Sequence, residues 1–333
     1  MIFHYKSLLL GAALMSTSVA VADITPGQAE KEKQDFVLQM SQQHGFDPQS
    51  LTKTLNQAEI KQSILDAISR PAEKTLTWTQ YRNIFIKPNR IEGGVKFWNE
   101  NEADLNKAYQ QFGVPPEIIT AIIGVETFYG KHTGGYRVLD ALTTLGFHYP
   151  PRSKFFRKEL SQFLLLTREE NVEPTAPTGS YAGAMGKPQF IPSSFRHYAI
   201  DFDKDGQRDI WSNNTDVIGS VASYFSRHGW RKNQPVTVPA GSVSDKHSEM
   251  LRAGMKPSIT VERMREAGIT IDENIRPGQL SSLVELVVTD GKEYWAGLHN
   301  FYVITRYNHS NMYAMAVYQL SQEILKARKT SNS

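Results

Sequence analysis

Glu126 is the only charged side chain between Ile118 and Gly130, in a run that is otherwise almost wholly apolar. Two prolines just before this run favour the start of a helix. On that helix Ile119, Ile122 and Ile123 lie seven, four and three residues before Glu126 and share its face. We therefore expect a poorly solvated carboxyl group with a raised pKa, which could donate a proton to a leaving group. The alternative is a structural glutamate held by an arginine or by backbone amides.

A second cluster of carboxylates follows the spacing of the 12-residue calcium-binding loop. Positions 1, 3, 5 and 9 of that template are Asp201, Asp203, Asp205 and Asp209. Gly206 stands at position 6, and Gln207 offers its backbone carbonyl at position 7. Position 12, where a bidentate glutamate is expected, is Ser212, so the template is incomplete. The pattern predicts a calcium site, and the alternative is a solvated Asp-Gly turn.

The third stretch with chemical potential runs from Gly179 to Phe195 and contains three glycines within eight residues. Glycines allow another group to approach the backbone closely. Ser180 and Gln189 are neutral hydrogen-bonding side chains of the kind that bind sugar hydroxyl and acetamide groups. The alternative is a structural loop that ends at a helix start, Pro192.

The composition excludes several classes of protein. The 333 residues can form two or three lobes of ordinary size, and a net charge of +3 is too balanced to indicate nucleic-acid binding. The absence of cysteine excludes disulfides, thiolate metal sites, a thiol nucleophile and lipid attachment through a thiol. No serine lies in a Gly-x-Ser-x-Gly elbow and no histidine pair has metal-ligand spacing, so a serine hydrolase and a histidine metal centre are not expected.

The first residues have the pattern of an export signal. Lys6 precedes an apolar segment, residues 8–15, and small residues end at Ala22, after which we expect cleavage. An uncleaved membrane anchor is the alternative, but the apolar segment is too short to span a bilayer comfortably. We therefore expect an exported, soluble, mature protein.

The elements that must position these residues are mainly helical. Apolar residues at three- and four-residue steps predict helices before residue 113, and the central segment predicts helices at about 117–129, 153–168, 189–199 and 214–228. Short β-rich runs follow, at 236–240, 258–262 and 281–289. A last amphipathic helix is expected from Tyr313 to Ala327.

Taken together and in order, four motifs resemble the lytic transglycosylase B family of bacterial cell-wall enzymes. They are Gly-Val-Glu126-Thr-Phe-Tyr-Gly, Gly179-Ser180 with Ala-Gly-Ala-Met-Gly186, Gln189-Phe with Pro192-Ser-Ser194, and Arg306-Tyr307-Asn308. The likeness covers residues 35–324. It implies an α+β, mainly helical fold with a lysozyme-like core, a helical lobe and a small β lobe around a peptidoglycan groove. It also implies cleavage of the β-1,4 bond between MurNAc and GlcNAc.

The resemblance implies a domain order and a location as well. The expected segments are a signal peptide (1–22), an N-terminal helical region (23–114), a lysozyme-like catalytic core (115–230) with an EF-hand-like loop (201–216), a small β-containing lobe (231–295) and a C-terminal segment that returns to the core (296–333). We expect a periplasmic monomer that binds peptidoglycan glycan strands and meets cell-wall synthesis enzymes. No nucleic acid and no organic cofactor are expected.

The family's functional residues map onto this chain one by one. Glu126 matches the catalytic acid, and the resemblance leaves open whether Tyr81 or Ser180 lies closest to it. The implied substrate-binding residues are Tyr81, Arg152, Ser180, Gln189, Tyr224, Tyr307, Asn308 and Tyr313. Asp216 would replace the missing position-12 ligand of a structural Ca²⁺ site. Lys187-Pro188 and Pro151 depart from the family pattern, which affects the expected subsite affinity.

The chemistry that follows needs one carboxylate. A two-carboxylate hydrolase requires a second Asp or Glu at about 5 to 9.5 Å from the acid, and no second motif carboxylate is found. Instead, Glu126 would protonate the glycosidic oxygen and then accept the proton of the C6 hydroxyl, which closes a 1,6-anhydro ring. The alternatives are a muramidase-type hydrolase and a non-catalytic peptidoglycan-binding scaffold.

Overall fold

The computed structural model describes residues 25–69 and 76–331. The predicted export signal, residues 1–22, lies outside the described residues. Within them, no helix combines the length and the apolar character needed to cross a membrane. The described chain divides into two compact units. The first unit contains residues 25–69 and 130–220, and the second contains residues 76–129 and 221–331.

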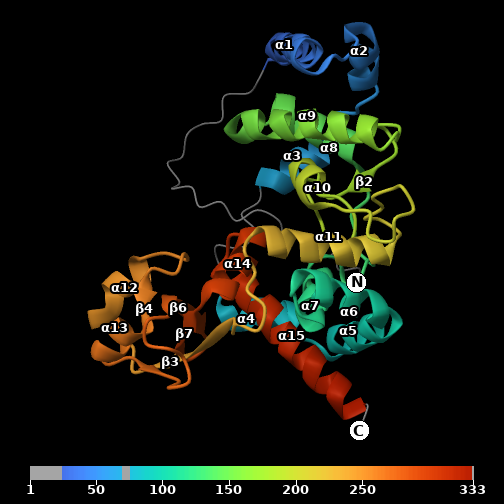
Figure 1. Cartoon of the computed structure of the whole chain (residues 1–333). Helices are drawn as coiled ribbons and strands as arrows, with labels where there is room; N and C mark the ends of the chain where they lie inside the picture. Colours follow the sequence, from blue (N-terminus) through green and yellow to red (C-terminus); the bar gives the residue numbers. More distant parts are fainter. Residues whose placement is uncertain (1–24, 70–75, 332–333) are drawn as a thin grey trace. The chain divides into compact units, whose positions relative to one another are not determined.

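Helices α8 and α9 form the centre of the first unit and pack against each other (Figure 1). Every residue of α8 except His148 is buried, because this helix is covered by α1, α3 and α9. The helices of the first unit are α1 (Pro26–His44), α2 (Pro48–Asn56), α3 (Gln62–Ser69), α8 (Val138–His148), the 3-10 helix η1 (Pro150–Arg152), α9 (Ser153–Glu169), α10 (Pro192–Tyr198) and the first half of α11 (Asn214–Arg227). Strands β1 (Tyr136–Arg137) and β2 (Thr178–Gly179) pair antiparallel.

Two buried carboxylates connect the helices of the first unit. Asp140 on α8 is 1% exposed and accepts the N–H of Glu59, which anchors the chain before α3. Glu159 on α9 accepts both the N–H and the hydroxyl of Ser193, each at 2.9 Å. Because the first N–H groups of a helix have no partner within it, Glu159 fixes the start of α10.

Helix α7 lies at the centre of the second unit, where α5, α6 and α15 pack around it. All of its residues are buried except Pro116, Glu117 and Glu126. The helices around it are α4 (Trp78–Phe85), α5 (Pro88–Glu100), α6 (Glu102–Phe112), α7 itself (Pro116–Thr127), the second half of α11, α14 (His299–Tyr307) and α15 (Asn311–Ser331).

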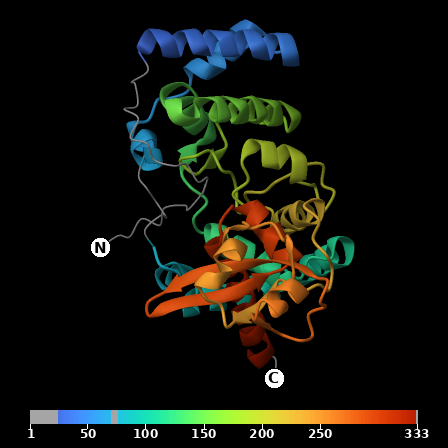
Figure 2. The ribbon, with the colours of Figure 1, turned by 90° about the vertical axis from the view of Figure 1, so that its left-hand side faces the viewer.

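The second unit also carries an antiparallel sheet with the strand order β4-β6-β7-β3-β5. Its strands are β3 (Thr237–Gly241), β4 (Ile259–Thr260), β5 (Thr270–Ile271), β6 (Leu280–Val288) and β7 (Gly291–Gly297). Figure 2 shows the long hairpin β6–β7, in which Val288 is opposite Gly291. The 3-10 helix η2 (Asp245–His247) and the short helices α12 (Ser248–Arg252) and α13 (Val261–Glu266) accompany the sheet, and a small apolar core around Met264 joins them.

The predicted fold class, mainly helical with a small β part, is confirmed. Two local predictions are wrong. The helix expected at 189–199 begins only at Pro192, because Gln189 adopts a left-handed turn with φ +52°. The strand expected at 258–262 stops at Thr260, whose side chain accepts the N–H of Arg263 and caps α13.

Candidate active site

Glu126 lies in the last turn of α7 and is half-buried, between residues that are fully buried. The hydroxyl of Tyr313 donates a hydrogen bond to its Oε1 at 2.5 Å. Tyr313 comes from the first turn of α15, and only 2% of its surface is exposed. The carboxyl group is therefore held by a donor that is itself fixed in the core. The sequence analysis had placed Tyr313 among the substrate-binding residues without this contact.

A row of aromatic rings continues from Tyr313. The ring of Tyr307, at the end of α14, is nearly parallel to that of Tyr313 at 6.5 Å. Tyr307 also contacts the ring of Tyr224 on α11 at 4.6 Å. Tyr224 donates a hydrogen bond from its hydroxyl to the carbonyl of Arg306, which connects α11 to α14. These rings give the second unit an aromatic wall next to Glu126.

The sequence analysis missed one member of this wall, His228. Its ring stacks on Tyr224 with centroids 4.1 Å apart, and its Nδ1 contacts the carbonyl of Tyr224 at 2.8 Å. Burial lowers the pKa of His228, the bond to the Tyr224 carbonyl opposes this shift, and the charge of Arg306 adds to it. The four-residue spacing between Tyr224 and His228 on one helix is the signal that could have found it.

The wall is a strongly perturbed electrostatic environment. Burial raises the pKa of Tyr313 well above its usual value, and the charges of Glu126, Tyr307 and Tyr81 raise it further. Burial also raises the pKa of Tyr307, followed by the charges of Glu126 and Tyr224. Both phenols therefore keep their protons across the physiological range. Tyr313 acts as a permanent donor to Glu126.

Tyr81 and Asn308 lie in the same unit as Glu126. Tyr81, on α4, is fully buried beside Trp78, and α4 packs against α15. Asn308 follows α14 and is 5% exposed, yet neither its amide nitrogen nor its amide oxygen has a partner within residues 25–69 and 76–331. Buried amides are nearly always hydrogen-bonded, so Asn308 has the unmet donors and acceptors of a ligand-binding group.

Ser180 and Gln189 belong to the first unit, in the glycine-rich loop. The hydroxyl oxygen of Ser180 accepts the N–H groups of Ala182 and Ala184, so this buried side chain shapes its own loop. Gln189 donates from Nε2 to the carbonyls of Thr133 and Gly186. Its Oε1 is buried and has no hydrogen-bond partner in the part of the chain that the structure describes.

Arg152 and Lys187 also belong to the first unit. The guanidinium of Arg152, at the end of η1, lies 4.5 Å from the ring centroid of Phe155. Lys187, which departs from the family pattern, donates from Nζ to the side chain of Asn214 and to the carbonyl of Ser212. This departure therefore links the glycine-rich loop to the start of α11.

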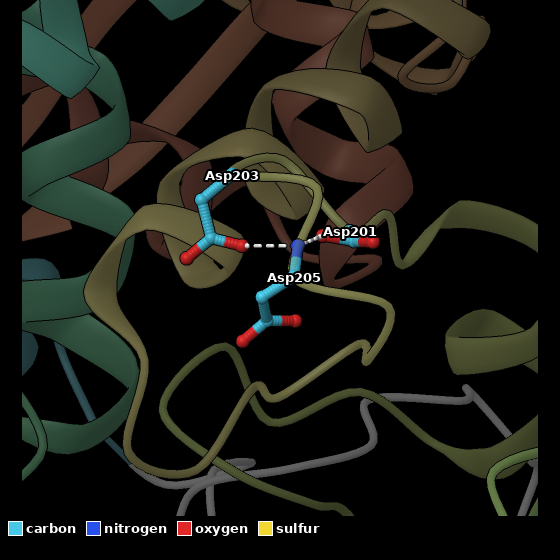
Figure 3. A group of neighbouring side chains, drawn as sticks. All are labelled: Asp201, Asp203 and Asp205. Atoms are coloured by element: carbon cyan, nitrogen blue, oxygen red, sulfur yellow. Dashed lines mark hydrogen bonds between the residues drawn. The ribbon is translucent and has the colours of Figure 1, made fainter.

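Three of the predicted metal ligands come together in the Asp201–Asp209 loop. Asp201, Asp203 and Asp205 each offer a carboxylate oxygen, and these oxygens lie within 4.8 Å of one another. Figure 3 shows that the backbone N–H of Asp205 donates to both other carboxylates, at 3.1 and 3.3 Å. The side chains are therefore held on one side of the loop by its own amides.

The other predicted metal ligands hold the loop backbone. Asp216 is fully buried and accepts the N–H of Phe202 at one oxygen and that of Asp209 at the other. Asp209 accepts the N–H groups of Trp211 and Ser212, and the N–H of Gln207 donates to Asp205. Burial raises the pKa of Asp216, and the charges of the neighbouring aspartates raise it further, while its two backbone hydrogen bonds lower it.

Comparison with known proteins identifies the family. Residues 28–322 match the model described as the transglycosylase SLT domain. The chain belongs to this family. It is 45% identical over 304 residues to membrane-bound lytic murein transglycosylase B of Escherichia coli (strain K12), which covers 89% of this chain and 83% of that protein. This lytic transglycosylase is thus a peptidoglycan-cleaving lyase, as the four motifs predict.

The solved structures confirm the lysozyme-like fold of this lytic transglycosylase. Soluble lytic transglycosylase SltB1 from Pseudomonas aeruginosa is 53% identical, with a TM-score of 0.85 over 90% of this chain and 99% of that one. Lytic transglycosylase Slt35 from Escherichia coli, solved in complex with calcium, is 44% identical, with a TM-score of 0.80 over 89% and 93%. SltB3 from Pseudomonas aeruginosa, solved with NAG-anhNAM-pentapeptide, is 27% identical, with a TM-score of 0.77 over 90% and 80%.

Proposed function

We propose that this lytic transglycosylase cleaves the MurNAc-GlcNAc β-1,4 bond with formation of a 1,6-anhydroMurNAc end, and that Glu126 serves first as acid and then as base. The observation that carries the proposal is the hydrogen bond from the buried Tyr313 hydroxyl to Glu126. A general acid that later acts as base needs a fixed geometry in both protonation states. Tyr313 supplies a donor for the carboxylate state, because burial raises its pKa.

In the first step, protonated Glu126 gives its proton to the glycosidic oxygen while the bond between that oxygen and the MurNAc C1 breaks. The substrate's own acetamide group stabilises the positive charge that develops at C1. In the second step, the Glu126 carboxylate takes the proton of the C6 hydroxyl, whose oxygen forms a bond to C1. Glu126 is protonated again, and no water is consumed.

The neighbouring tyrosines would hold the sugar and restrict water. Tyr307 and Tyr224 present ring surface next to Tyr313, and aromatic faces pack well against the apolar faces of sugars. Asn308 carries a buried amide with no partner among the described residues, which suits a sugar hydroxyl or acetamide. We assign Tyr81, which is fully buried on α4, to the same wall.

The first unit would supply further substrate contacts. Gln189 Oε1 is an acceptor without a partner among the described residues, and we assign it to a donor group of the glycan. Ser180 has a hydroxyl proton to donate while its oxygen holds the loop. Arg152 would bind an acidic group of the peptide stem. The binding of NAG-anhNAM-pentapeptide by the related SltB3 supports a substrate that carries a peptide.

We also propose a structural calcium ion in the Asp201–Asp209 loop. The residues present fit such an ion, because Ca²⁺ prefers several carboxylate and carbonyl oxygens, and three carboxylates already lie together. Asp201, Asp203 and Asp205 would hold it with the Gln207 carbonyl and Asp209, and Asp216 would complete or support the shell. The ion would neutralise the mutual repulsion of these carboxylates and stabilise the chain after Gln189. The calcium complex of the related Slt35 supports this assignment.

The remaining parts of the proposal concern the cellular setting. Residues 1–22 would direct export, so that the mature enzyme acts as a monomer in the periplasm, where peptidoglycan lies. Cell-wall synthesis enzymes are proposed partners.

The decisive test is digestion of purified sacculi with mass analysis of the products. We expect muropeptides that are lighter by one water than those of a muramidase, because the anhydro ring forms without hydrolysis. Glu126→Gln is expected to lower the rate by about 10²- to 10⁴-fold, the usual contribution of a general acid or base. Binding of this variant to sacculi should be retained. Products with reducing ends would indicate a muramidase, and lysis by Glu126→Gln at the normal rate would indicate a different catalytic group.

A further inference from the structure

The chain leaves α7 in an unusual conformation directly after Glu126 and Thr127. Phe128 and Tyr129 both have positive φ angles, +51° and +60°. A helix end normally uses one left-handed glycine, and two consecutive non-glycine residues in this region persist only when the surroundings hold them. Here the Phe128 N–H donates to the carbonyl of Gly124, and the Tyr129 N–H donates to that of Ile123.

Arg90 on α5 is the first group that holds this helix end. It is 5% exposed, and its guanidinium donates to the carbonyl of Gly124 at 2.5 Å. The same guanidinium lies over the ring of Phe128 at 4.9 Å and over that of Phe85 at 5.2 Å. A positive charge at the carboxyl end of a helix also interacts favourably with the helix dipole. Arg90 therefore contacts both the last turn of α7 and the residue that follows it.

Tyr129 is the second group, and it returns the contact to α5. Its hydroxyl donates to the backbone carbonyl of Arg90 at 2.7 Å. Its ring occupies space that side chains at Gly94 and Gly124 would fill, because a Cβ on either glycine would lie 2.6 Å from the Tyr129 hydroxyl. The ring also stacks on Phe97 at 5.7 Å. Burial raises the pKa of Tyr129, so the hydroxyl stays a donor.

Arg90 and Tyr129 thus form a reciprocal pair, which we call the α7 clamp. Each residue holds a backbone group on the other side: Arg90 holds the Gly124 carbonyl of α7, and Tyr129 holds the Arg90 carbonyl of α5. Glu126 lies between the two clamped points, two residues after Gly124 and two before Phe128. The clamp therefore restrains both the rotation of the last turn and its distance from α5.

We propose that Arg90 and Tyr129 are positioning residues for the known reaction, and that the α7 clamp fixes the direction in which Glu126 presents its carboxyl group. This inference rests on the proposed role of Glu126. The clamp approaches the last turn of α7 from α5, whereas Tyr313 reaches the carboxyl group from α15. The two contacts together define where the proton is delivered, and an error of about 1 Å in such a position can cost about 100-fold in rate.

The test compares Tyr129→Phe and Arg90→Lys with two matched controls in the same unit. Tyr109→Phe removes a hydroxyl that donates to Asn233 at 3.0 Å, far along the chain from α7. Arg328→Lys changes an arginine that lies over Trp98 at 4.7 Å and pairs with Glu102. Purified full-length proteins are assayed on soluble peptidoglycan glycan strands for kcat and KM. Tm and binding to sacculi are measured in parallel.

We expect kcat to fall by about 10-fold in Tyr129→Phe and by about 10- to 100-fold in Arg90→Lys, with KM within about two-fold of the wild type. Both controls should keep the wild-type kcat. The double variant should lose less than the product of the single losses, because both changes open the same clamp. A purely structural clamp would lower Tm and leave kcat of the folded protein unchanged, and that result would overturn the proposal.

Glu126→Gln separates this inference from the proposed function. If Glu126→Gln is inactive and the clamp variants keep full kcat, the positioning role is wrong and the catalytic role of Glu126 stands. If Glu126→Gln remains active, the proposed function itself fails. Should Arg90→Lys not fold, Tyr129→Phe alone decides, since it removes one hydroxyl and keeps the ring between the glycines.

Discussion

Glu126 and the Asp201–Asp209 loop show two different ways of holding carboxylates. Glu126 is a single carboxyl on a buried helix, and a side-chain hydroxyl from another helix, α15, donates to it. In the loop, neighbouring carboxylates are held by the loop's own backbone amides within a few residues. The first arrangement isolates one acid next to aromatic rings. The second gathers negative charge at exposed positions.

This difference explains why only the first arrangement suits proton transfer. Clustered carboxylates repel one another, and a cation relieves that repulsion without any change of protonation. A solitary carboxyl beside buried phenols has no such partner charge, and its protonation can follow the substrate. The carboxylates of this chain therefore divide into a reactive one and a cation-binding group, and each of the following changes tests one side of that division.

Tyr313→Phe should have the largest effect of the three. It removes the hydroxyl that donates to Glu126 and keeps the buried ring, so Tm should change little. A hydrogen bond to a charged group contributes about 1.5 to 3 kcal/mol, which corresponds to a loss of about 10- to 100-fold in kcat. The assay is turnover of soluble glycan strands.

The matched control is Tyr318→Phe on the same helix, α15. This variant should turn over substrate at the wild-type rate, because Tyr318 stands outside the wall formed by Tyr313, Tyr307 and Tyr224. Wild-type kcat in Tyr313→Phe would show that the carboxyl of Glu126 needs no side-chain donor. The comparison with the loop would then lose its first half.

Sequence could predict Glu126 and the aspartate loop because both signals are local. The apolar face of α7 and the aspartate spacing each lie within a dozen residues, and the periodicity of a helix or the ligand order of a loop is written in neighbouring positions. The same reasoning located the central helices to within a few residues.

The contacts that connect distant segments could not be predicted in this way. Tyr313 reaches Glu126 across 187 positions of the chain, and Arg90 reaches Gly124 across 34. No pattern within a helix specifies which hydroxyl will face a carboxyl on another helix, because tertiary packing decides it. Likewise, β7 pairs with both β6 and β3, although its sequence Gly-Lys-Glu-Tyr-Trp-Ala-Gly has weak alternation.

Removal of calcium should have the second largest effect. If free calcium is about a hundred times its dissociation constant, the bound ion contributes about 2.7 kcal/mol, and EDTA should lower Tm by about 5 to 10 °C. Asp203→Asn should lose most of this response, since it removes one carboxylate of the cluster. The measurement is thermal unfolding with calcium and with chelator.

Asp245→Asn is the control, because Asp245 is an exposed aspartate in η2, outside the loop. It should respond to calcium like the wild type. Equal Tm values with calcium and with EDTA would remove the metal from the proposal and leave the loop as an amide-bonded turn.

Glu159 provides the smallest but most discriminating test, because it combines both arrangements: a backbone amide and a hydroxyl of Ser193 hold one buried carboxyl. Burial raises its pKa above the ordinary value of 4.5, and the two bonds from Ser193 only partly oppose this shift. A raised pKa in the folded state means that the stabilising contribution is complete below 4.5 and is lost as the pH rises through the folded value. Wild-type stability should therefore fall relative to Glu159→Gln between about pH 4 and pH 7, measured by denaturant unfolding.

Glu169, on the same helix, should behave in the opposite way. Its hydrogen bond to Arg196 is the main cause of a lowered pKa, so its contribution is present above the ordinary value and is lost as the pH falls. Glu169→Gln should accordingly be less stable than the wild type at pH 7 and converge with it in acid. If the two variants showed the same pH dependence, local hydrogen bonding would outweigh burial at both positions. The distinction between an isolated buried carboxyl and a solvent-exposed paired one would then not account for the behaviour of this chain's acids.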